Sequence, residues 1–383
     1  MRITKLYKDF FNSEKTSGLI LIVCTILSLT IANSNSGTNY NDFWQIQFAG
    51  HSIVHWINDG LMSIFFLLIG LELEREIYHG ELSNIKDALL PIFAALGGII
   101  IPAGIFMYFN IGTNTQSGAG IPMATDIAFA LGILSLLGNK VPTSLKIFLT
   151  ALAVIDDLGA ILIIATFYTK TIFWMNLLIA LGIFGTLLIL NKLKVKILTI
   201  YLIGGVAMWY FMLNSGVHAT ITGVLLAFAI PYRDGRENSA SYRLQHFLHK
   251  PVAFIILPIF ALANTAIILS GDIGETLSQN YSIGIALGLI IGKPLGIFLL
   301  TFIAVSIGFC KLPEDLSWKS IIGVGFLGGI GFTMSIFITL LAFDNDDIIN
   351  KAKFVILLSS LIAGLIGFIS LKLFLRKEYL DTE

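Results

Sequence analysis

Residues 144–168 read SLKIFLTALAVIDDLGAILIIATFY, an apolar run with two aspartates near its middle. A helix needs about 20 apolar residues to cross the hydrocarbon core of a bilayer. A charged side chain at the centre of such a helix costs about 2.5–3.5 kcal/mol, even on the scale that gives the smallest values. Asp156 and Asp157 therefore predict a membrane helix with a functional site inside the bilayer.

The composition of the whole chain indicates the same class. Of its 383 residues, 56% are hydrophobic and 13% are charged, whereas soluble domains carry roughly 25% charged residues. The mean hydropathy is +0.86. A net charge of +0 gives no reason to expect nucleic acid as a partner. Cys24 and Cys310 lie in apolar runs and predict neither a disulfide framework nor a metal site.

Further apolar runs predict an all-α polytopic membrane protein with twelve transmembrane helices. The first run is interpreted as a helix, because no small-residue cleavage pattern of a signal peptide follows it. No soluble domain or long linker interrupts the runs, so residues 1–383 are predicted to form one integral membrane domain. The longest polar connection runs from Pro231 to Lys250. The runs are residues 17–32, 53–73, 88–109, 121–137, 144–168, 172–190, 197–213, 217–230, 252–269, 282–309, 320–343 and 354–375.

The basic residues predict the orientation of these helices. An even number of spans places both termini on one side of the membrane. Of the 24 basic residues, all but Lys170, Lys293, Lys351 and Lys353 fall on the side of the termini. Cytoplasmic loops carry such an excess, so both termini are predicted to be cytoplasmic, in the inner membrane of a bacterium.

One loop on the opposite side has a different pattern. In residues 43–48 the apolar Trp44, Ile46 and Phe48 alternate with two glutamines. This alternation is typical of a strand. An irregular loop with interfacial aromatic residues explains the pattern equally well.

Four charged residues fall inside the predicted spans: Asp126, Asp156, Asp157 and Lys293. A buried Asp–Lys pair that only fixes helix packing would need one carboxylate and one ammonium group. Here the additional carboxylates require a cation, a proton or water. Because neighbouring helix residues point about 100° apart, Asp156 and Asp157 cannot present the same face. One of them can line a passage while the other turns towards Lys293. Carboxylate oxygens suit hard cations, so this site can hold either a cation or protons.

Two of the spans contain helix-breaking residues. Gly118, Gly120 and Pro122 open the fourth span, and five glycines lie between Gly323 and Gly331. The two spans occupy corresponding places in repeat-like units of about residues 88–168 and 282–375. This arrangement predicts inverted repeats, with two interrupted helices that cross at the midplane. Close packing of small residues is the alternative explanation.

The ends of the broken helices also carry partial charges. We infer from their signs that Asp126 offsets the facing N-termini and that Lys293 offsets the facing C-termini.

Five segments together resemble the family of NhaA-type Na⁺/H⁺ antiporters, in family order and over nearly the whole chain. The resemblance implies that Asp157 is the principal Na⁺ ligand and proton carrier, that Asp156 shares the site and pairs with Lys293, and that Thr125 lies near the cation. It implies electrogenic exchange of more than one proton per Na⁺, acceptance of Li⁺, and no cofactor. The segments are FFLLIGLE (65–72), PMATDIAFALG (122–132), DDLGA (156–160), GKPLG (292–296) and GIGFTMS (329–335).

The resemblance also implies a pH response. His218 matches a histidine linked to it, and Glu72, Arg75 and Glu76 match the cytoplasmic mouth where pH is sensed. Gln245 stands where the family has a glutamate and Tyr242 where a basic residue is frequent, so the pH profile is expected to be shifted or blunted. A hydrogen-bonded structural histidine, and a charged helix end with pairs three and four residues apart, are the alternatives for these sites.

The resemblance further implies a homodimer that forms through the loop near Trp44–Phe48. Three other functions are alternatives to antiport. An intramembrane aspartyl protease would use Asp126 and Asp157 as facing acids, but its Gly-x-Gly-Asp context is absent and Lys293 is unexplained. A cation channel favours rings of like residues. A sodium-coupled solute symporter of related fold stays open, and the chain is expected not to be an enzyme.

Overall fold

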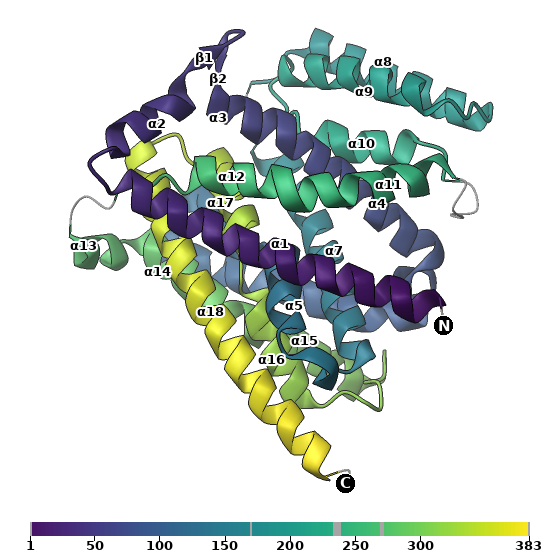
Figure 1. Ribbon diagram of the computed structural model, residues 1–383, viewed down its shortest axis with the longest axis vertical. Helices are drawn as coiled ribbons and strands as arrows, with labels where there is room; N and C mark the ends of the chain where they lie inside the picture. Colours follow the sequence, from purple (N-terminus) through teal and green to yellow (C-terminus); the bar gives the residue numbers. More distant parts are fainter. Residues whose placement is uncertain (1, 169–170, 233–238, 269–271, 382–383) are drawn as a thin grey trace. The chain divides into compact units, whose positions relative to one another are not determined.

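The computed structural model describes residues 2–168, 171–232, 239–268 and 272–381, and most of them are helical (Figure 1). The chain divides into two compact units. Unit 1 consists of Met1–Gly37, Asn84–Ala160 and Asn264–Glu383, and unit 2 consists of Thr38–Ser83 and Ile161–Ala263. Helix α7 (Thr143–Phe167) contributes residues to both.

Unit 1 contains long apolar helices and two short 3₁₀ segments. The π-helical turn η6 joins α14 to α15 in one continuous helix. Besides most of α7, the elements are α1 (Arg2–Ala32), α5 (Ile85–Asn110), η3 (Gln116–Met123), α6 (Ile127–Ser135), η4 (Gly138–Lys140), α13 (Ile273–Ser278), α14 (Asn280–Leu287), η6 (Gly288–Gly292), α15 (Lys293–Ile307), α16 (Trp318–Gly328), α17 (Phe332–Ala342) and α18 (Asp346–Asp381).

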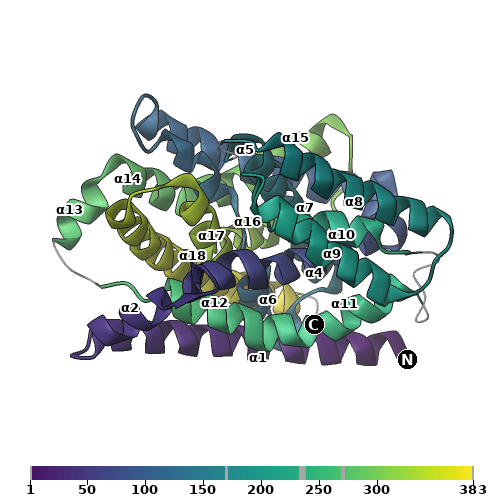
Figure 2. The same cartoon turned by 90° about the horizontal axis from the view of Figure 1, so that it is seen from above.

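Unit 2 combines helices with a two-stranded hairpin. Helices α8 and α9 lie side by side in both views (Figures 1 and 2). The elements are α2 (Gly37–Gln45), β1 (Gln47–Phe48), β2 (His51–Ser52), α3 (Ile53–His55), the π-helical turn η1 (Trp56–Leu61), α4 (Met62–His79), the 3₁₀ turn η2 (Glu81–Ser83), α8 (Trp174–Lys192), α9 (Leu198–Leu213), α10 (Ile221–Ala229), α11 (Ala240–Pro251), the π-helical turn η5 (Val252–Ile256) and α12 (Leu257–Asn264).

The predicted class, an all-α polytopic membrane protein, is confirmed. Within the described residues, nine helices are long and apolar enough to cross a membrane, and a tenth is formed if α16 and α17 make one bent span. Two predicted spans form shorter helices, α9 with 16 residues and α10 with 9. The number of twelve spans is therefore not confirmed. Lys170, Arg233 and Arg236, used in predicting the orientation, lie outside the described residues.

Two helices are broken where the glycine-rich segments predicted it. Residues 124–126 are extended and separate η3 from α6. Helices α16 and α17 are bent by 47° around residues 329–331. The two breaks touch each other, because the backbone N–H of Asp126 donates to the Ile330 carbonyl at 2.6 Å. Whether residues 88–168 and 282–375 form inverted repeats stays a prediction.

Helices α5 and α15 approach each other at two glycines. A Cβ atom on Gly97 would lie 2.0 Å from the Gly296 carbonyl oxygen, and one on Gly296 would lie 2.1 Å from the Gly97 carbonyl oxygen. No side chain fits in this space, so only glycine allows the contact. Since Lys293 lies less than one turn from Gly296, the contact also sets the position of Lys293.

The polar connection predicted at residues 231–250 is partly helical. Ser239 caps α11 by accepting a hydrogen bond from the Tyr242 N–H. Helix α11 buries one face at helical spacing, and it continues through η5 into α12. The prediction missed this helix because its outer face is polar. The buried residues are Ser241, Leu244, Gln245 and Leu248.

Helix α18 begins earlier than the predicted span. The apolar run starts at residue 354, whereas the helix starts at Asp346. Lys353, which was assigned to the loop side, is therefore buried within the helix. The predicted span contained only the apolar run. It therefore left out the charged first turns of the helix.

The predicted strand at residues 43–48 exists only at its end. Helix α2 includes Trp44, and β1 contains only Gln47 and Phe48. β1 pairs antiparallel with β2, with Phe48 opposite His51. The turn between them has positive φ angles at Ala49 and Gly50, as tight hairpin turns require.

Candidate functional site

The acidic pair lies in the middle of α7 and is buried. Asp156 is 2% exposed and Asp157 is 1% exposed. The helix around them consists of small and apolar residues, and Ala153, Val154 and Ala160 are buried beside the pair. Nothing in this segment breaks the helix, so the two carboxylates project in different directions, as helix geometry predicts.

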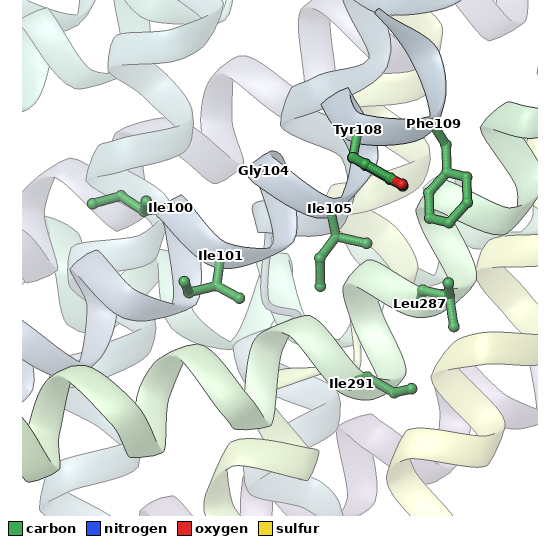
Figure 3. A pocket seen from close by; sticks show the side chains of 8 residues that line it. All are labelled: Ile100, Ile101, Gly104, Ile105, Tyr108, Phe109, Leu287 and Ile291. Atoms are coloured by element: carbon green, nitrogen blue, oxygen red, sulfur yellow. The ribbon is translucent and has the colours of Figure 1, made fainter.

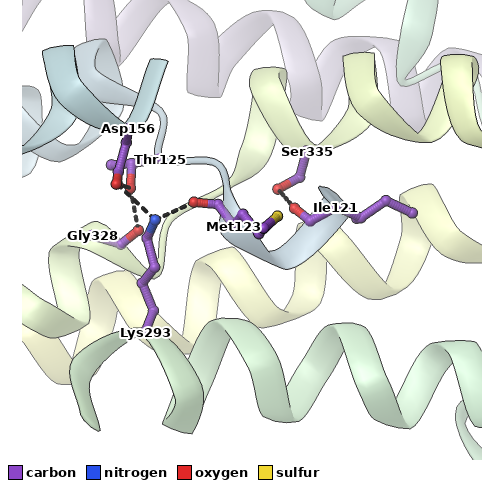
Figure 4. A network of polar contacts seen from close by, with 7 residues as sticks. All are labelled: Ile121, Met123, Thr125, Asp156, Lys293, Gly328 and Ser335. Atoms are coloured by element: carbon purple, nitrogen blue, oxygen red, sulfur yellow. Dashed lines mark hydrogen bonds and ion pairs between the residues drawn. The ribbon is translucent and has the colours of Figure 1, made fainter. Parts of the chain in front are cut away.

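Lys293 is the cationic partner of Asp156. Its Nζ lies 2.6 Å from Asp156 Oδ2, and neither side chain is exposed. The same ammonium group also donates a hydrogen bond to the Met123 carbonyl (Figure 4). Lys293 is therefore held by a carboxylate from α7 and by the last residue of η3.

Thr125 connects this pair to the second broken helix. Its hydroxyl lies 2.7 Å from Asp156 Oδ2 and 2.8 Å from the Gly328 carbonyl oxygen (Figure 4). A hydroxyl has a single proton, so it can donate to only one of these oxygens at a time. Two acceptor oxygens, one from α7 and one from the end of α16, thus lie within hydrogen-bond distance of the Thr125 hydroxyl.

Asp126 is bound by the N-termini of two half-helices. Its Oδ1 accepts a hydrogen bond from the Phe129 N–H at 3.0 Å, in the first turn of α6. Its Oδ2 accepts from the Thr333 N–H at 3.1 Å and from the Thr333 hydroxyl at 2.5 Å, in the first turn of α17. This is the predicted position of the carboxylate, because helix N-termini attract negative charge.

The C-terminal ends of the other two half-helices contact hydrogen-bond donors, of which one is charged. η3 ends at Met123, whose carbonyl contacts Lys293, and α16 ends at Gly328, whose carbonyl contacts Thr125. Lys293 therefore contacts one of the two predicted C-termini directly. The sequence interpretation did not identify these two backbone carbonyls. Every residue has a carbonyl, and only the break in each helix makes these two available as acceptors.

The acceptor oxygens of this site suit a small hard cation. Within the described residues, Asp156 Oδ1 is buried and accepts no hydrogen bond. It lies on the residue next to Asp157, and the Thr125 hydroxyl lies beside the other oxygen of Asp156. Carboxylate, hydroxyl and carbonyl oxygens are the ligands of hard cations. The residues predicted to hold Na⁺, which are Asp157, Asp156 and Thr125, thus fit the ion chemically.

The predicted pH-response residues belong to unit 2. Arg75 Nη2 lies 2.8 Å from Glu76 Oε1, both on α4. Glu72 lies one turn before this pair on the same helix. These three residues thus lie on one helix, and their role in the pH response stays a prediction.

One further carboxylate on α4 was missed. Glu74 is 4% exposed, and its Oε2 accepts a hydrogen bond from the Ser241 hydroxyl at 3.1 Å. Gln245 follows Ser241 by one turn of α11 and is also buried. The family resemblance pointed to Glu72 and Glu76 on α4, whereas only the packing of α4 on α11 reveals Glu74.

Tyr232 lies near the end of α4. Its hydroxyl lies 3.0 Å from His79 Nδ1. Burial raises the pKa of the Tyr232 hydroxyl, so the hydroxyl stays protonated at neutral pH and can donate to His79.

His218 forms a hydrogen bond within unit 2. Its Nε2 lies 3.0 Å from the Tyr168 carbonyl oxygen, so the ring nitrogen donates. This contact agrees with the structural alternative for His218. A role in the pH response stays a prediction.

An apolar cavity of about 560 Å³ in unit 1 has no charged residue in its lining. It is lined by α5 and by residues of α14 and η6, and the Tyr108 hydroxyl is its principal polar group (Figure 3). With no carboxylate among its lining residues, it is not a cation site.

Comparisons with known proteins find similarity along nearly the whole chain. Residues 8–371 match the family model described as Na⁺/H⁺ antiporter 1. A protein named Na(+)/H(+) antiporter NhaA from Flavobacterium psychrophilum is 74% identical over 383 residues, which cover 100% of both chains. Proteins of the same name from Cytophaga hutchinsonii and Dechloromonas aromatica are 63% and 60% identical, over 100% and 98% of this chain and 99% and 98% of theirs.

Proposed function

Because the chain belongs to the family of NhaA-type Na⁺/H⁺ antiporters, we propose that it exports Na⁺ from the cytoplasm in exchange for more than one proton. The exchange is electrogenic, accepts Li⁺ as well as Na⁺, is regulated by pH and proceeds by alternating access. Members of this family are transporters rather than enzymes. No cofactor takes part, and the ligands are the transported ions.

The observation that carries the proposal is the buried cluster of Asp156, Lys293 and Thr125 at the contact of two broken helices. Asp157 is the principal Na⁺ ligand and carries a proton in the absence of Na⁺. Asp156 and Thr125 complete the cation site. Asp126 and Lys293 compensate the charges of the half-helix ends.

Competition for the same oxygens explains the coupling. Na⁺ and protons both neutralise the carboxylates, so the binding of one excludes the other. A ligand can shift the carrier between inward-facing and outward-facing states only through different affinities for them. The empty site leaves its carboxylates charged inside the membrane, which is costly, so this state switches slowly.

The alternatives need other arrangements of the same residues. An aspartyl protease needs two acids that share a proton, yet Asp126 is bound by Phe129 and Thr333 on half-helix N-termini. A sodium-coupled symporter of related fold would need a pocket for an organic solute next to the ion site.

We further propose the setting in which the antiporter works. Its single domain crosses the inner membrane of a bacterium twelve times, with inverted repeats and with both termini in the cytoplasm. Two copies associate through the loop near Trp44–Phe48. The exposed side chain of Phe48 supports this contact, since exposed apolar patches outside a membrane mark interaction sites.

Proton flux in everted membrane vesicles tests the function. We expect Na⁺ or Li⁺ to dissipate a preformed pH gradient in vesicles that contain the protein, and Asp157→Asn to abolish this flux because the main ligand and proton carrier is lost. Asp347→Asn is the matched control, since Asp347 is exposed and pairs with Lys351 at the start of α18. Full Na⁺-dependent flux in Asp157→Asn would refute the site, and the absence of any Na⁺- or Li⁺-dependent flux would refute the function.

A further inference from the structure

A histidine cluster at the start of the first long helix of unit 2 is separate from the residues of the ion site. His51 in β2 stacks on His55 in α3, with ring centroids 4.3 Å apart and an angle of 13° between the rings. The other face of the cluster is acidic, because His55 Nδ1 lies 3.3 Å from Asp59 Oδ2 in η1. Two imidazoles and one carboxylate thus form a continuous group.

The titratable side chains around this carboxylate come from several elements. His55, His218 and His51 act electrostatically on Asp59. His218 belongs to the segment before α10, where its Nε2 donates to the Tyr168 carbonyl. Asp59 therefore interacts electrostatically with the stacked pair and with one further histidine.

The cluster also joins the β1–β2 hairpin to the helix. Trp56 in η1 donates a hydrogen bond from Nε1 to the Phe48 carbonyl of β1 at 2.8 Å. The Trp56 ring packs edge-on against His51, with centroids 6.0 Å apart. Because His51 pairs with Phe48 across the hairpin, a movement of His51 also moves β1.

The number of protons on the stacked rings decides whether they can stay together. A second proton would place two positive charges on parallel rings 4.3 Å apart, beside only one carboxylate. The stacked arrangement therefore binds fewer protons than the separated one, and by linkage acid favours separation.

We propose that His51, His55 and Asp59 form an acid-sensitive latch that holds the β1–β2 hairpin against η1 and releases it when the second histidine is protonated. At neutral and alkaline pH the rings are stacked and the hairpin is held. Histidine is the side chain whose charge changes in this range. With the topology proposed above, the latch responds to the pH outside the cytoplasm; only this assignment of side rests on the proposed function.

A spin label on the hairpin tests the latch without any measurement of transport. The label is attached to the full chain at Phe48→Cys, with Cys24→Ala and Cys310→Ala removing the native thiols, in nanodiscs that hold one protomer. The backbone contact of Phe48 with Trp56 is kept, because only the side chain is exchanged. We expect the mobility of the label to rise as the pH falls from about 8 to about 5.

Variants of the cluster identify the groups responsible. His51→Phe and His55→Phe each keep an aromatic ring but remove one proton site, so the pH response should be lost in both. Asp59→Asn should move the midpoint to higher pH, because the stacked state loses the carboxylate that offsets positive charge on the rings. The control, His246→Gln on the exposed face of α11, should keep the response of the parent protein.

Two results would overturn the latch. One is a label mobility that stays constant over the whole pH range in the parent protein. The other is a pH response that survives in His51→Phe or in His55→Phe. Neither result bears on Na⁺/H⁺ exchange, so the proposed function and the latch are tested separately.

Discussion

At the scale of the residue, the ion site depends on a charge balance that one lysine maintains. Lys293 and Asp156 are completely buried, and their contact at 2.6 Å offsets the cost of placing both charges there. Removing one partner of such a pair leaves an uncompensated charge, which costs about 3–5 kcal/mol. The Thr125 hydroxyl also lies within hydrogen-bond distance of Asp156, but a neutral hydroxyl cannot replace the charge of the ammonium group.

Lys293→Ala is therefore expected to lower the free energy of unfolding by about 3–5 kcal/mol and to lower the transport rate. The measurement is the melting temperature of the purified protein, followed by its intrinsic fluorescence. Lys351→Ala, which breaks an exposed pair with Asp347 on α18, serves as the control and should change little. The double variant Lys293→Ala/Asp156→Asn should recover part of the loss. An unchanged melting temperature in Lys293→Ala would contradict the pairing.

The same carboxylates predict how Na⁺ affinity depends on pH. Protons that occupy Asp157 or Asp156 exclude Na⁺, so the apparent KM for Na⁺ should rise as pH falls and decrease as pH rises. The change is at most about tenfold per pH unit for each competing proton, by linkage. Initial rates in proteoliposomes at a series of pH values measure it. A KM that is independent of pH would mean that the two ions do not compete.

At the scale of the element, the close contact of α5 and α15 positions Lys293. The two backbones touch at Gly97 and Gly296, where an added Cβ would lie only 2.0 or 2.1 Å from the facing carbonyl oxygen, far inside van der Waals contact. Overpacking of this kind costs about 1–3 kcal/mol, since the helices must move apart. Any such movement displaces Lys293 from Asp156, because Lys293 lies in the same turn of α15.

Gly296→Ala should consequently lower both the melting temperature and the transport rate. Gly104→Ala provides a control on α5 itself, because nothing lies within 4 Å of the added Cβ and alanine favours a helix over glycine. Its stability should be equal to or slightly above that of the parent protein. If Gly296→Ala behaved like Gly104→Ala, the close contact would not set the position of Lys293.

The elements also show which patterns sequence reasoning can use. Both breaks were predicted from glycine and proline at residues 118–122 and 323–331, because these residues destabilise a helix wherever they occur. Helix α11 was missed because its apolar face is narrow and its remaining residues are polar. For residues 43–48 the alternation left a strand and an irregular loop equally open, and the structure has a strand only at Gln47 and Phe48, after the end of α2 at Gln45.

At the scale of the whole molecule, the distribution of basic residues predicts that the chain begins and ends in the cytoplasm. A C-terminal fusion to green fluorescent protein should therefore be fluorescent, whereas a fusion to alkaline phosphatase should be inactive. Fusions within the hairpin, after Gly50, should show the reverse. An active phosphatase at the C-terminus would contradict the even number of spans or the orientation.

The sequence by itself determined the membrane class, the position of most helices, the two breaks and the four charges inside the apolar runs. These features depend on the free energy of transferring short segments from water to lipid. This free energy is set by the residues of each segment itself. Only the tertiary structure decided the partners. Lys293 meets Asp156 across 137 positions, and Thr333 meets Asp126 across 207. Glu74 became visible in the same way through its contact with Ser241, because burial and pairing depend on neighbours that are distant in the chain.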